Sequence, residues 1–286
     1  MWKDESRAFG ENQSTSNRVV VIIGASGGIG RALLDSYRGE GVALYLVAHN
    51  GYEALATFAY DATARGDYPF LRVYRADLAE PDVSLQLAQS IQNNVKLDFG
   101  EQVCIDELAL CAGVDLMVPE RRELTFAERL RHALQIDVES TIVIARALGR
   151  FMRDHRRARG LDGRDGGLLF FSWDGVERGR SGETSELYAA CKGAISGYAR
   201  SLAQSLSPEV RVNTIAPGWI STRWGTSAPS PIRARLSCDS LAQRWGEPSE
   251  IVSLARFLLS SNASYVNAQT VEANGGYAYS GADRSS

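Results

Sequence analysis

The sequence lacks the features that mark membrane-spanning and secreted proteins. Its 286 residues contain no uninterrupted apolar run of the roughly 18–20 residues that a spanning helix needs. The N-terminal stretch MWKDESRAFGENQSTSNR is polar and has no apolar centre of the kind found in secretory signals. We therefore expect no membrane partner, and we expect residues 1–17 to form a disordered leader.

Cysteine and net charge are also scarce. The four cysteines, Cys104, Cys111, Cys191 and Cys238, show neither metal-ligand spacing nor the pattern of a disulfide framework. We therefore expect no metal and a reducing, cytoplasmic compartment. The formal net charge of -3 gives no general attraction to nucleic acid. Hydrophobic residues make up 44% of the chain, which is enough for a substantial core.

Apolar segments of strand length alternate with segments of helix length along the chain. The predicted strands are residues 18–24, 42–48, 70–76, 106–113, 166–172, 209–218 and 268–276. The predicted helices are residues 30–41, 52–64, 81–94, about 125–152, 184–205 and 248–261. Continuously apolar strands that alternate with helices indicate a parallel sheet covered on both faces. No linker interrupts this pattern, so we expect one α/β domain over residues 18–286.

The first predicted strand runs directly into a glycine-rich turn, GASGGIG, and then into a helix. Its glycines at Gly24, Gly28 and Gly30 allow a tight turn and let a pyrophosphate approach the backbone. The helix N-terminus then offers unpaired N–H groups and the positive end of a dipole. The strand–turn–helix context predicts dinucleotide binding rather than a merely structural turn.

The segment LYAACKG contains Tyr188 and Lys192, four positions apart on a predicted helix. Taken alone, the pair fits either an acid–base site or a half-buried tyrosine beside a solvated lysine. Positions four apart lie on one helix face, so both side chains can point into one cleft. An unperturbed tyrosine has a pKa of about 10. A nearby ammonium group and a positively charged nicotinamide would favour the phenolate and lower that pKa.

These motifs, in this order and followed by a Pro-Gly turn after the sixth strand, resemble the classical short-chain dehydrogenase/reductase family. The segments RVNTIAPGWIST and RWGEPSEIVSLARFLLSSNASYVNAQTVEANGG resemble its later signatures, so the likeness covers nearly the whole chain. The resemblance implies a single Rossmann-fold domain with a doubly wound, seven-stranded parallel sheet. It also implies hydride transfer between a nicotinamide and a carbonyl or alcohol substrate, in a homodimer or homotetramer.

The resemblance further implies roles for individual residues. Tyr188 would exchange a proton with the substrate oxygen, and Lys192 would assist it and hold the nicotinamide ribose. RADL resembles the family's aspartate turn at the adenine, and CAG resembles its Asn-Ala-Gly motif with cysteine in place of asparagine. The residues implied to bind the cofactor are Gly24, Ser26, Gly28, Ile29, Gly30, His49, Asn50, Asp77, Leu78, Cys111, Ala112, Gly113, Tyr188, Lys192, Pro217, Gly218, Ile220 and Thr222.

Two positions of the implied catalytic set depart from the family pattern. The family has an asparagine that supports a proton relay where this chain has Asp137, which could keep a water-mediated link to Lys192 or serve only the helix structure. The family commonly has a serine thirteen residues before the tyrosine, where this chain has Gly175. Ser172 and Asp174 are the candidates for that role. We expect Asp174 to face the substrate beside Tyr188, with a turn-capping Asp174 and an orienting Ser172 as the alternative.

The cofactor and the substrate are less strongly indicated. The second predicted strand ends at His49 and Asn50 without the acid that usually marks NAD preference, so NADP(H) is favoured over NAD(H). Residues 218–244 resemble the variable substrate lid, where Trp219 and Trp224, with Trp173, could line an apolar pocket or simply pack. We expect a ketone or aldehyde reductase. A non-redox lyase or epimerase and a cofactor-binding regulatory protein without turnover remain alternatives.

Overall fold

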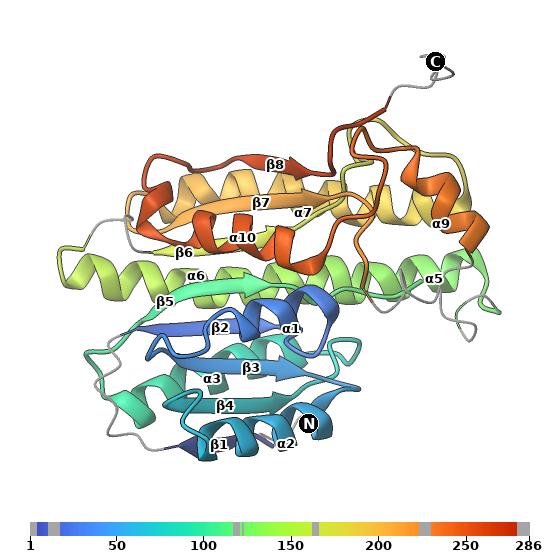
Figure 1. Cartoon of the computed structure of the whole chain (residues 1–286). Helices are drawn as coiled ribbons and strands as arrows, with labels where there is room; N and C mark the ends of the chain where they lie inside the picture. The colour runs from blue at the N-terminus through green and yellow to red at the C-terminus, as the bar shows by residue number, and fades with distance from the viewer. Residues whose placement is uncertain are drawn as a thin grey trace.

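An eight-stranded sheet forms the centre of the domain (Figure 1). The computed structural model describes residues 5–10, 18–116, 121, 123–161, 166–222 and 230–278. The strand order is β1-β4-β3-β2-β5-β6-β7-β8, and all neighbours from β4 to β8 are parallel. The strands are β1 (Arg7–Gly10), β2 (Val19–Ile23), β3 (Ala43–Ala48), β4 (Phe70–Arg75), β5 (Ile105–Leu110), β6 (Gly167–Phe171), β7 (Arg211–Pro217) and β8 (Thr270–Ala273).

Strand β1 corrects two of the expectations from the sequence. It lies inside the segment that we expected to be a disordered leader, and it makes the sheet eight-stranded rather than seven-stranded. It pairs antiparallel with β4, from Arg7 opposite Val73 to Gly10 opposite Phe70. It has only four residues, RAFG, and they are mostly exposed, so the segment carried no apolar pattern that would predict a strand. The open backbone groups at the edge of β4 supply the pairing instead.

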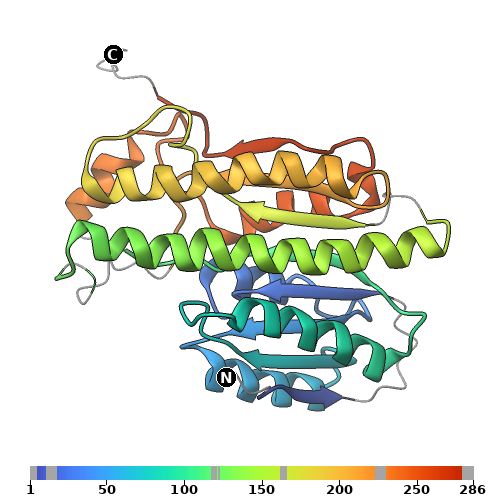
Figure 2. The same ribbon diagram turned by 180° about the vertical axis from the view of Figure 1, so that it is seen from behind.

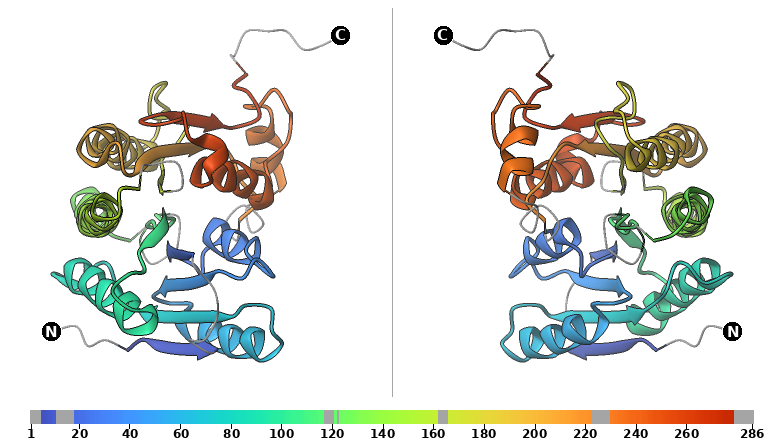
Figure 3. Two further views of the ribbon diagram at one scale, coloured as in Figure 1. Left: turned by 90° about the vertical axis from the view of Figure 1, so that its left-hand side faces the viewer. Right: turned by 90° about the vertical axis from the view of Figure 1, so that its right-hand side faces the viewer.

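Helices cover both faces of the sheet, as the edge-on views show (Figure 3). Helices α1 (Gly28–Asp35), α2 (Tyr52–Ala64) and α10 (Pro248–Leu259) pack on one face. Helices α3 (Val83–Phe99), α6 (Thr141–Ala158) and α7 (Glu183–Leu206) pack on the other, where Figure 2 shows them side by side. The remaining elements are α5 (Phe126–Ala133), the π-helix η1 (Leu134–Ser140), α9 (Ser230–Ser237) and the short 3-10 helix η2 (Ser261–Ala263).

The two faces have separate hydrophobic cores because the side chains of each strand alternate between them. All five residues of β2 are buried, with Val19, Val21 and Ile23 in one core and Val20 and Ile22 in the other. Apolar residues at every position are what a central parallel strand covered on both faces requires. The fold is therefore the doubly wound α/β domain that the alternating pattern predicted. Within the described ranges, no helix is long and apolar enough to cross a membrane.

A buried arginine ties the sheet to the end of α10. Arg211, in β7, is 3% exposed. Its guanidinium donates to the carbonyl oxygens of Leu258, Leu259 and Ser260 at distances of 2.8, 3.2 and 2.9 Å. The last carbonyls of a helix have no partner within the helix, so Arg211 satisfies groups that would otherwise be buried without hydrogen bonds.

Candidate active site

The glycine turn lies between the end of β2 and the start of α1, at the edge of the sheet where the parallel strands end. Gly24 has a φ of 88°, in the left-handed region that favours glycine. A side chain there would also bring a Cβ within 2.6 Å of the Ala112 backbone nitrogen. A Cβ on Gly30 would collide with the Gly24 carbonyl oxygen. These two glycines let the turn, the segment after β5 and the first turn of α1 pack together.

The beginning of α1 fits the pyrophosphate of a dinucleotide. Its N-cap is Gly27, which has no side chain to satisfy the first N–H groups of the helix. A Cβ on Gly28 would lie 2.6 Å from the Thr222 side chain, so Thr222 reaches over the same helix end. Free N–H groups and the helix dipole favour an anion at this place. The residues of the turn therefore fit the cofactor that the motif implies.

Tyr188, Lys192 and Asp137 come together at the same edge of the sheet. Tyr188 and Lys192 lie one turn apart on α7, and Asp137 lies on the π-helix η1, which packs against α7. The Lys192 ammonium donates to Asp137 Oδ1 at 2.5 Å, and both residues are buried. Asp137 therefore contacts Lys192 directly. π-Helical turns often occur at functional sites, because the extra residue re-aims side chains.

Val114 links the carboxylate to the tyrosine through its backbone. Its N–H donates to Asp137 Oδ2 at 2.9 Å. Its carbonyl oxygen accepts a hydrogen bond from the Tyr188 hydroxyl at 3.1 Å. Sequence reasoning missed this residue because a backbone contact leaves no mark on the residue type. The only available signal was its place directly after the CAG segment.

The charge balance around Tyr188 differs from the expected one. Burial raises the pKa of Tyr188 above its ordinary value, and the carboxylates of Asp137 and Asp115 raise it further, while Arg121 opposes them. The sequence argument expected Lys192 to lower this pKa. Lys192 is paired with Asp137, so its positive charge is largely compensated at the phenol.

Within the described ranges, neither Ser172 nor Asp174 makes a hydrogen bond with the Tyr188 hydroxyl. The Ser172 hydroxyl lies 2.7 Å from that of Ser196 and 3.1 Å from the Lys192 carbonyl oxygen, so it is engaged by α7. The Asp174 carboxylate accepts from the Asn274 amide at 3.3 Å, on the side of β8. Burial raises the pKa of Asp174, with Arg180 acting in the opposite direction. The geometry does not support the expected placement of Asp174 beside Tyr188.

Trp173 occupies the position between these two residues and turns toward Tyr188. The two ring centroids are 6.1 Å apart with an interplanar angle of 63°. A Cβ on Gly175 would overlap the indole ring, so this glycine makes room for the tryptophan.

The residues expected at the adenine end lie after β3 and β4. His49 Nδ1 is 3.6 Å from Asp77 Oδ1, and Asn50 beside it is exposed. Asp77 also accepts a hydrogen bond from the Ala79 N–H at 2.9 Å, which closes the turn. The Leu78 carbonyl oxygen accepts from the Ser140 hydroxyl at 2.8 Å. This bond connects the adenine-side turn to η1, the element that carries Asp137.

The remaining expected cofactor residues line the same edge. The Cys111 N–H donates to the Ile23 carbonyl oxygen at 2.8 Å, beside the glycine turn. Gly113 leaves space above the ion pair, because a Cβ there would lie 3.1 Å from Asp137 Oδ1 and 3.5 Å from Lys192 Nζ. The positions not placed individually above are distributed over the turn and α1 (Ser26, Ile29), the end of β7 (Pro217, Gly218) and the segment after it (Ile220).

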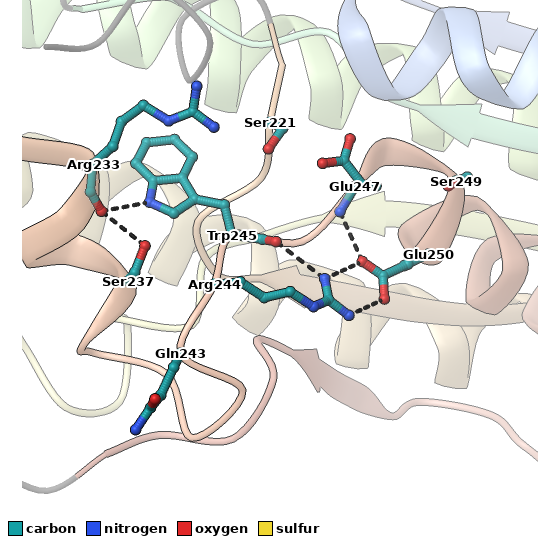
Figure 4. A pocket seen from close by; sticks show the side chains of 9 residues that line it. All are labelled: Ser221, Arg233, Ser237, Gln243, Arg244, Trp245, Glu247, Ser249 and Glu250. Carbon is teal, nitrogen blue, oxygen red and sulfur yellow. Dashed lines mark hydrogen bonds and ion pairs between the residues drawn. The ribbon is translucent and has the colours of Figure 1, made fainter. Parts of the chain in front are cut away.

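The expected lid, residues 218–244, is described except for residues 223–229, which include Trp224. Trp219 packs on Trp245, with ring centroids 5.5 Å apart, and its indole N–H donates to Asp239 Oδ2 at 3.3 Å. Figure 4 shows a pocket of about 590 Å³ between α9 and the start of α10. It is lined by Ser221, Arg233, Ser237, Gln243, Arg244, Trp245, Glu247, Ser249 and Glu250.

That pocket is polar, and it does not include the Tyr188 group. Arg244 is held by Glu250 at 2.7 Å, and the Trp245 indole donates to the Arg233 carbonyl oxygen at 3.2 Å (Figure 4). Tyr188 and Asp137 instead border a much narrower space, together with Val114, Leu187 and Cys191. The Tyr188 group, at the same edge of the sheet as the glycine turn, is therefore the candidate active site among the described residues. The described residues contain no group of three or more acidic, histidine or cysteine side chains that could hold a metal.

Comparison with known proteins agrees with this geometry. Residues 24–278 match the family model described as enoyl-(acyl carrier protein) reductase. The short-chain reductase protein NovJ of Streptomyces niveus is 31% identical over 268 residues, which cover 90% of this chain and 93% of NovJ. The 3-oxoacyl-[acyl-carrier-protein] reductase FabG of Salmonella typhimurium is 27% identical over 268 residues, with 92% of this chain and 98% of that protein covered.

A solved structure extends the likeness to three dimensions. The short-chain dehydrogenase/reductase of Brucella melitensis described as a glucose/ribitol dehydrogenase is 26% identical and superimposes with a TM-score of 0.73. The alignment covers 93% of this chain and 99% of that one. The family model and NovJ both match most of the chain, which includes the glycine turn and the Tyr188–Lys192 helix. The chain belongs to the short-chain dehydrogenase/reductase family.

Proposed function

We propose that this protein is an NADP(H)-dependent carbonyl reductase in which Tyr188 exchanges a proton with the substrate oxygen. The observation that carries the proposal is the placement of Tyr188 and Lys192 on one face of α7, at the strand ends beside the glycine turn. Members of this family use a nicotinamide cofactor, which supplies the hydride when bound. The protein must then position the carbonyl and supply the proton.

The described side chains are suited to positioning a carbonyl group and to supplying its proton. The Tyr188 hydroxyl already donates a hydrogen bond, to Val114, and a substrate oxygen could replace that acceptor. The Lys192 ammonium has three N–H donors, so it can hold ribose hydroxyls while one donor stays on Asp137. Trp173 offers an aromatic wall beside the phenol. This wall favours carbonyl substrates with an apolar or aromatic group next to the reacting carbon.

The proposal is tested by offering NADPH with a panel of ketones, aldehydes and a 3-oxoacyl thioester, and following NADPH consumption. We include the thioester because one of the relatives named above, FabG of Salmonella typhimurium, is a 3-oxoacyl-[acyl-carrier-protein] reductase. Consumption that depends on one carbonyl class, with the matching alcohol as product, is the expected result. Cofactor binding without turnover of any carbonyl in the panel would contradict the proposal.

A preference for NADPH over NADH is expected from the end of β3. No carboxylate side chain follows this strand directly, and His49 is present where an acid would bind the ribose 2′-hydroxyl. We expect His49→Asp to weaken NADPH binding relative to NADH by about tenfold, because a carboxylate repels the 2′-phosphate. Fluorescence titration of both cofactors measures the ratio. His155→Asp, at a half-buried position near the end of α6, is the matched control and should leave the ratio unchanged.

A regulatory protein that binds the cofactor without turnover is the second candidate. Its supporting observation is the missing serine donor: Ser172 is engaged by Ser196 and the Lys192 carbonyl oxygen, and the next residue, Trp173, packs against the Tyr188 ring. In that case both cofactors would bind normally, but Tyr188→Phe would change no measurable activity. The carbonyl panel separates this candidate from the reductase.

A further inference from the structure

A direct ion pair between Asp137 and Lys192 distinguishes this site from one with an amide at the same position. Asp137 is 2% exposed, and both of its carboxylate oxygens are occupied. Oδ1 accepts from Lys192 Nζ at 2.5 Å, and Oδ2 accepts from the Val114 N–H at 2.9 Å. An asparagine has one acceptor oxygen and no charge, so it could not make both contacts as an acceptor. The carboxylate is therefore part of the geometry around the lysine.

The same carboxylate also affects the hydroxyl of Tyr188, through Val114. The Val114 peptide group is held on one side by Asp137, and its carbonyl oxygen accepts from the Tyr188 hydroxyl at 3.1 Å. This acceptor stabilises the protonated phenol, because a phenolate would have no hydrogen to donate. The arrangement holds Tyr188 as a proton donor.

The charges around Tyr188 also favour its protonated form. The described charged and titratable groups that act on the phenol are Asp137 on η1, Asp115 and Arg121 in the segment after β5, and Cys191 on its own helix. Lys192 is the cation closest in sequence, and its charge is compensated by Asp137. Asp115 is exposed, so water screens its charge more strongly than that of the buried Asp137.

We propose that Asp137 is a positioning residue that neutralises Lys192 and keeps Tyr188 protonated to a higher pH than an amide at this position would. The inference rests on the proposed carbonyl reductase function. During reduction, the O–H bond of Tyr188 breaks and the proton moves to the substrate oxygen, while the carbonyl carbon receives the hydride from the reduced nicotinamide. If Tyr188 titrates at a higher pH, its proton stays available for reduction over a wider pH range. The phenolate that alcohol oxidation requires then forms only at higher pH.

The first measurement does not depend on turnover. Tyr188 is titrated by the ultraviolet absorbance of the phenolate, as the difference between each protein and its Tyr188→Phe counterpart, because the chain has 11 tyrosines. We expect Asp137→Asn to lower the titration pH of Tyr188 by about 1–2 units, since the variant removes a negative charge and leaves Lys192 uncompensated. Asp115→Asn is the matched control, and its shift should be much smaller because Asp115 is exposed.

The second measurement uses the pH profile of kcat/KM with a carbonyl substrate from the panel. The alkaline limb of reduction and the acidic limb of alcohol oxidation should both move to lower pH in Asp137→Asn, by the same amount as the phenol titration. Asp137→Ser provides a second neutral variant if circular dichroism shows that the amide impairs folding. A Tyr188 titration that is unchanged in the folded neutral variants would overturn the inference. Absence of turnover with a shifted titration would instead count against the reductase function alone.

Discussion

Tyr188→Phe is expected to lower kcat/KM for carbonyl reduction by about 10²–10⁴-fold, the usual contribution of a positioned acid or base. The phenyl ring can still pack against Trp173, since the ring contact at 6.1 Å does not use the hydroxyl. Only the proton and the hydrogen bond to Val114 are lost. NADPH affinity should therefore stay nearly unchanged when it is measured by fluorescence titration.

Tyr198→Phe is the matched control for this change. Tyr198 lies on the same helix, ten positions further along, and its buried hydroxyl has no hydrogen-bond partner in the described part of the chain. The control should retain activity close to that of the unmodified protein. If Tyr188→Phe kept a comparable activity, Tyr188 would not be the proton carrier, and the role implied by the family would not apply to this chain.

Arg211→Met is expected to lower the free energy of unfolding by about 2–4 kcal/mol, because it removes charged hydrogen bonds to buried carbonyl groups. Methionine fills a similar volume but cannot donate, so the carbonyl oxygens of Leu258, Leu259 and Ser260 would lose their donor. The end of α10 should loosen from β7. Urea unfolding followed by circular dichroism, at a fixed protein concentration, measures the change.

Arg65→Met is the control for Arg211→Met. Arg65 instead pairs with a carboxylate, that of Asp67 at 3.0 Å, and its side chain is 55% exposed. Exposed ion pairs contribute about 0–1 kcal/mol, so this variant should unfold almost like the unmodified protein. If both variants lost the same free energy of unfolding, burial of Arg211 would not be the reason that its contacts are stabilising.

The alternation of apolar segments and the glycine turn were sufficient to predict the architecture. The predicted strand at residues 70–76 is β4 (Phe70–Arg75), and the predicted helix at residues 184–205 is α7 (Glu183–Leu206). These features depend on neighbouring residues, whose spacing shows whether a segment is covered on one face or on two. The same local spacing placed Tyr188 and Lys192 on one face of a helix.

The partners of those two residues depended on contacts between distant segments. Asp137 and Lys192 are separated by 55 positions, and Tyr188 and Val114 by 74, so no local pattern could show that they touch. Val114 acts through its backbone, which any residue type could supply. The spacing argument that favoured Asp174 counted positions alone and could not show that its carboxylate accepts a hydrogen bond from Asn274, 100 positions away. The sequence by itself determined the order of strands and helices and the position of Tyr188 on its helix, whereas the packing of η1, α7 and the segment after β5 decided which charges surround Tyr188.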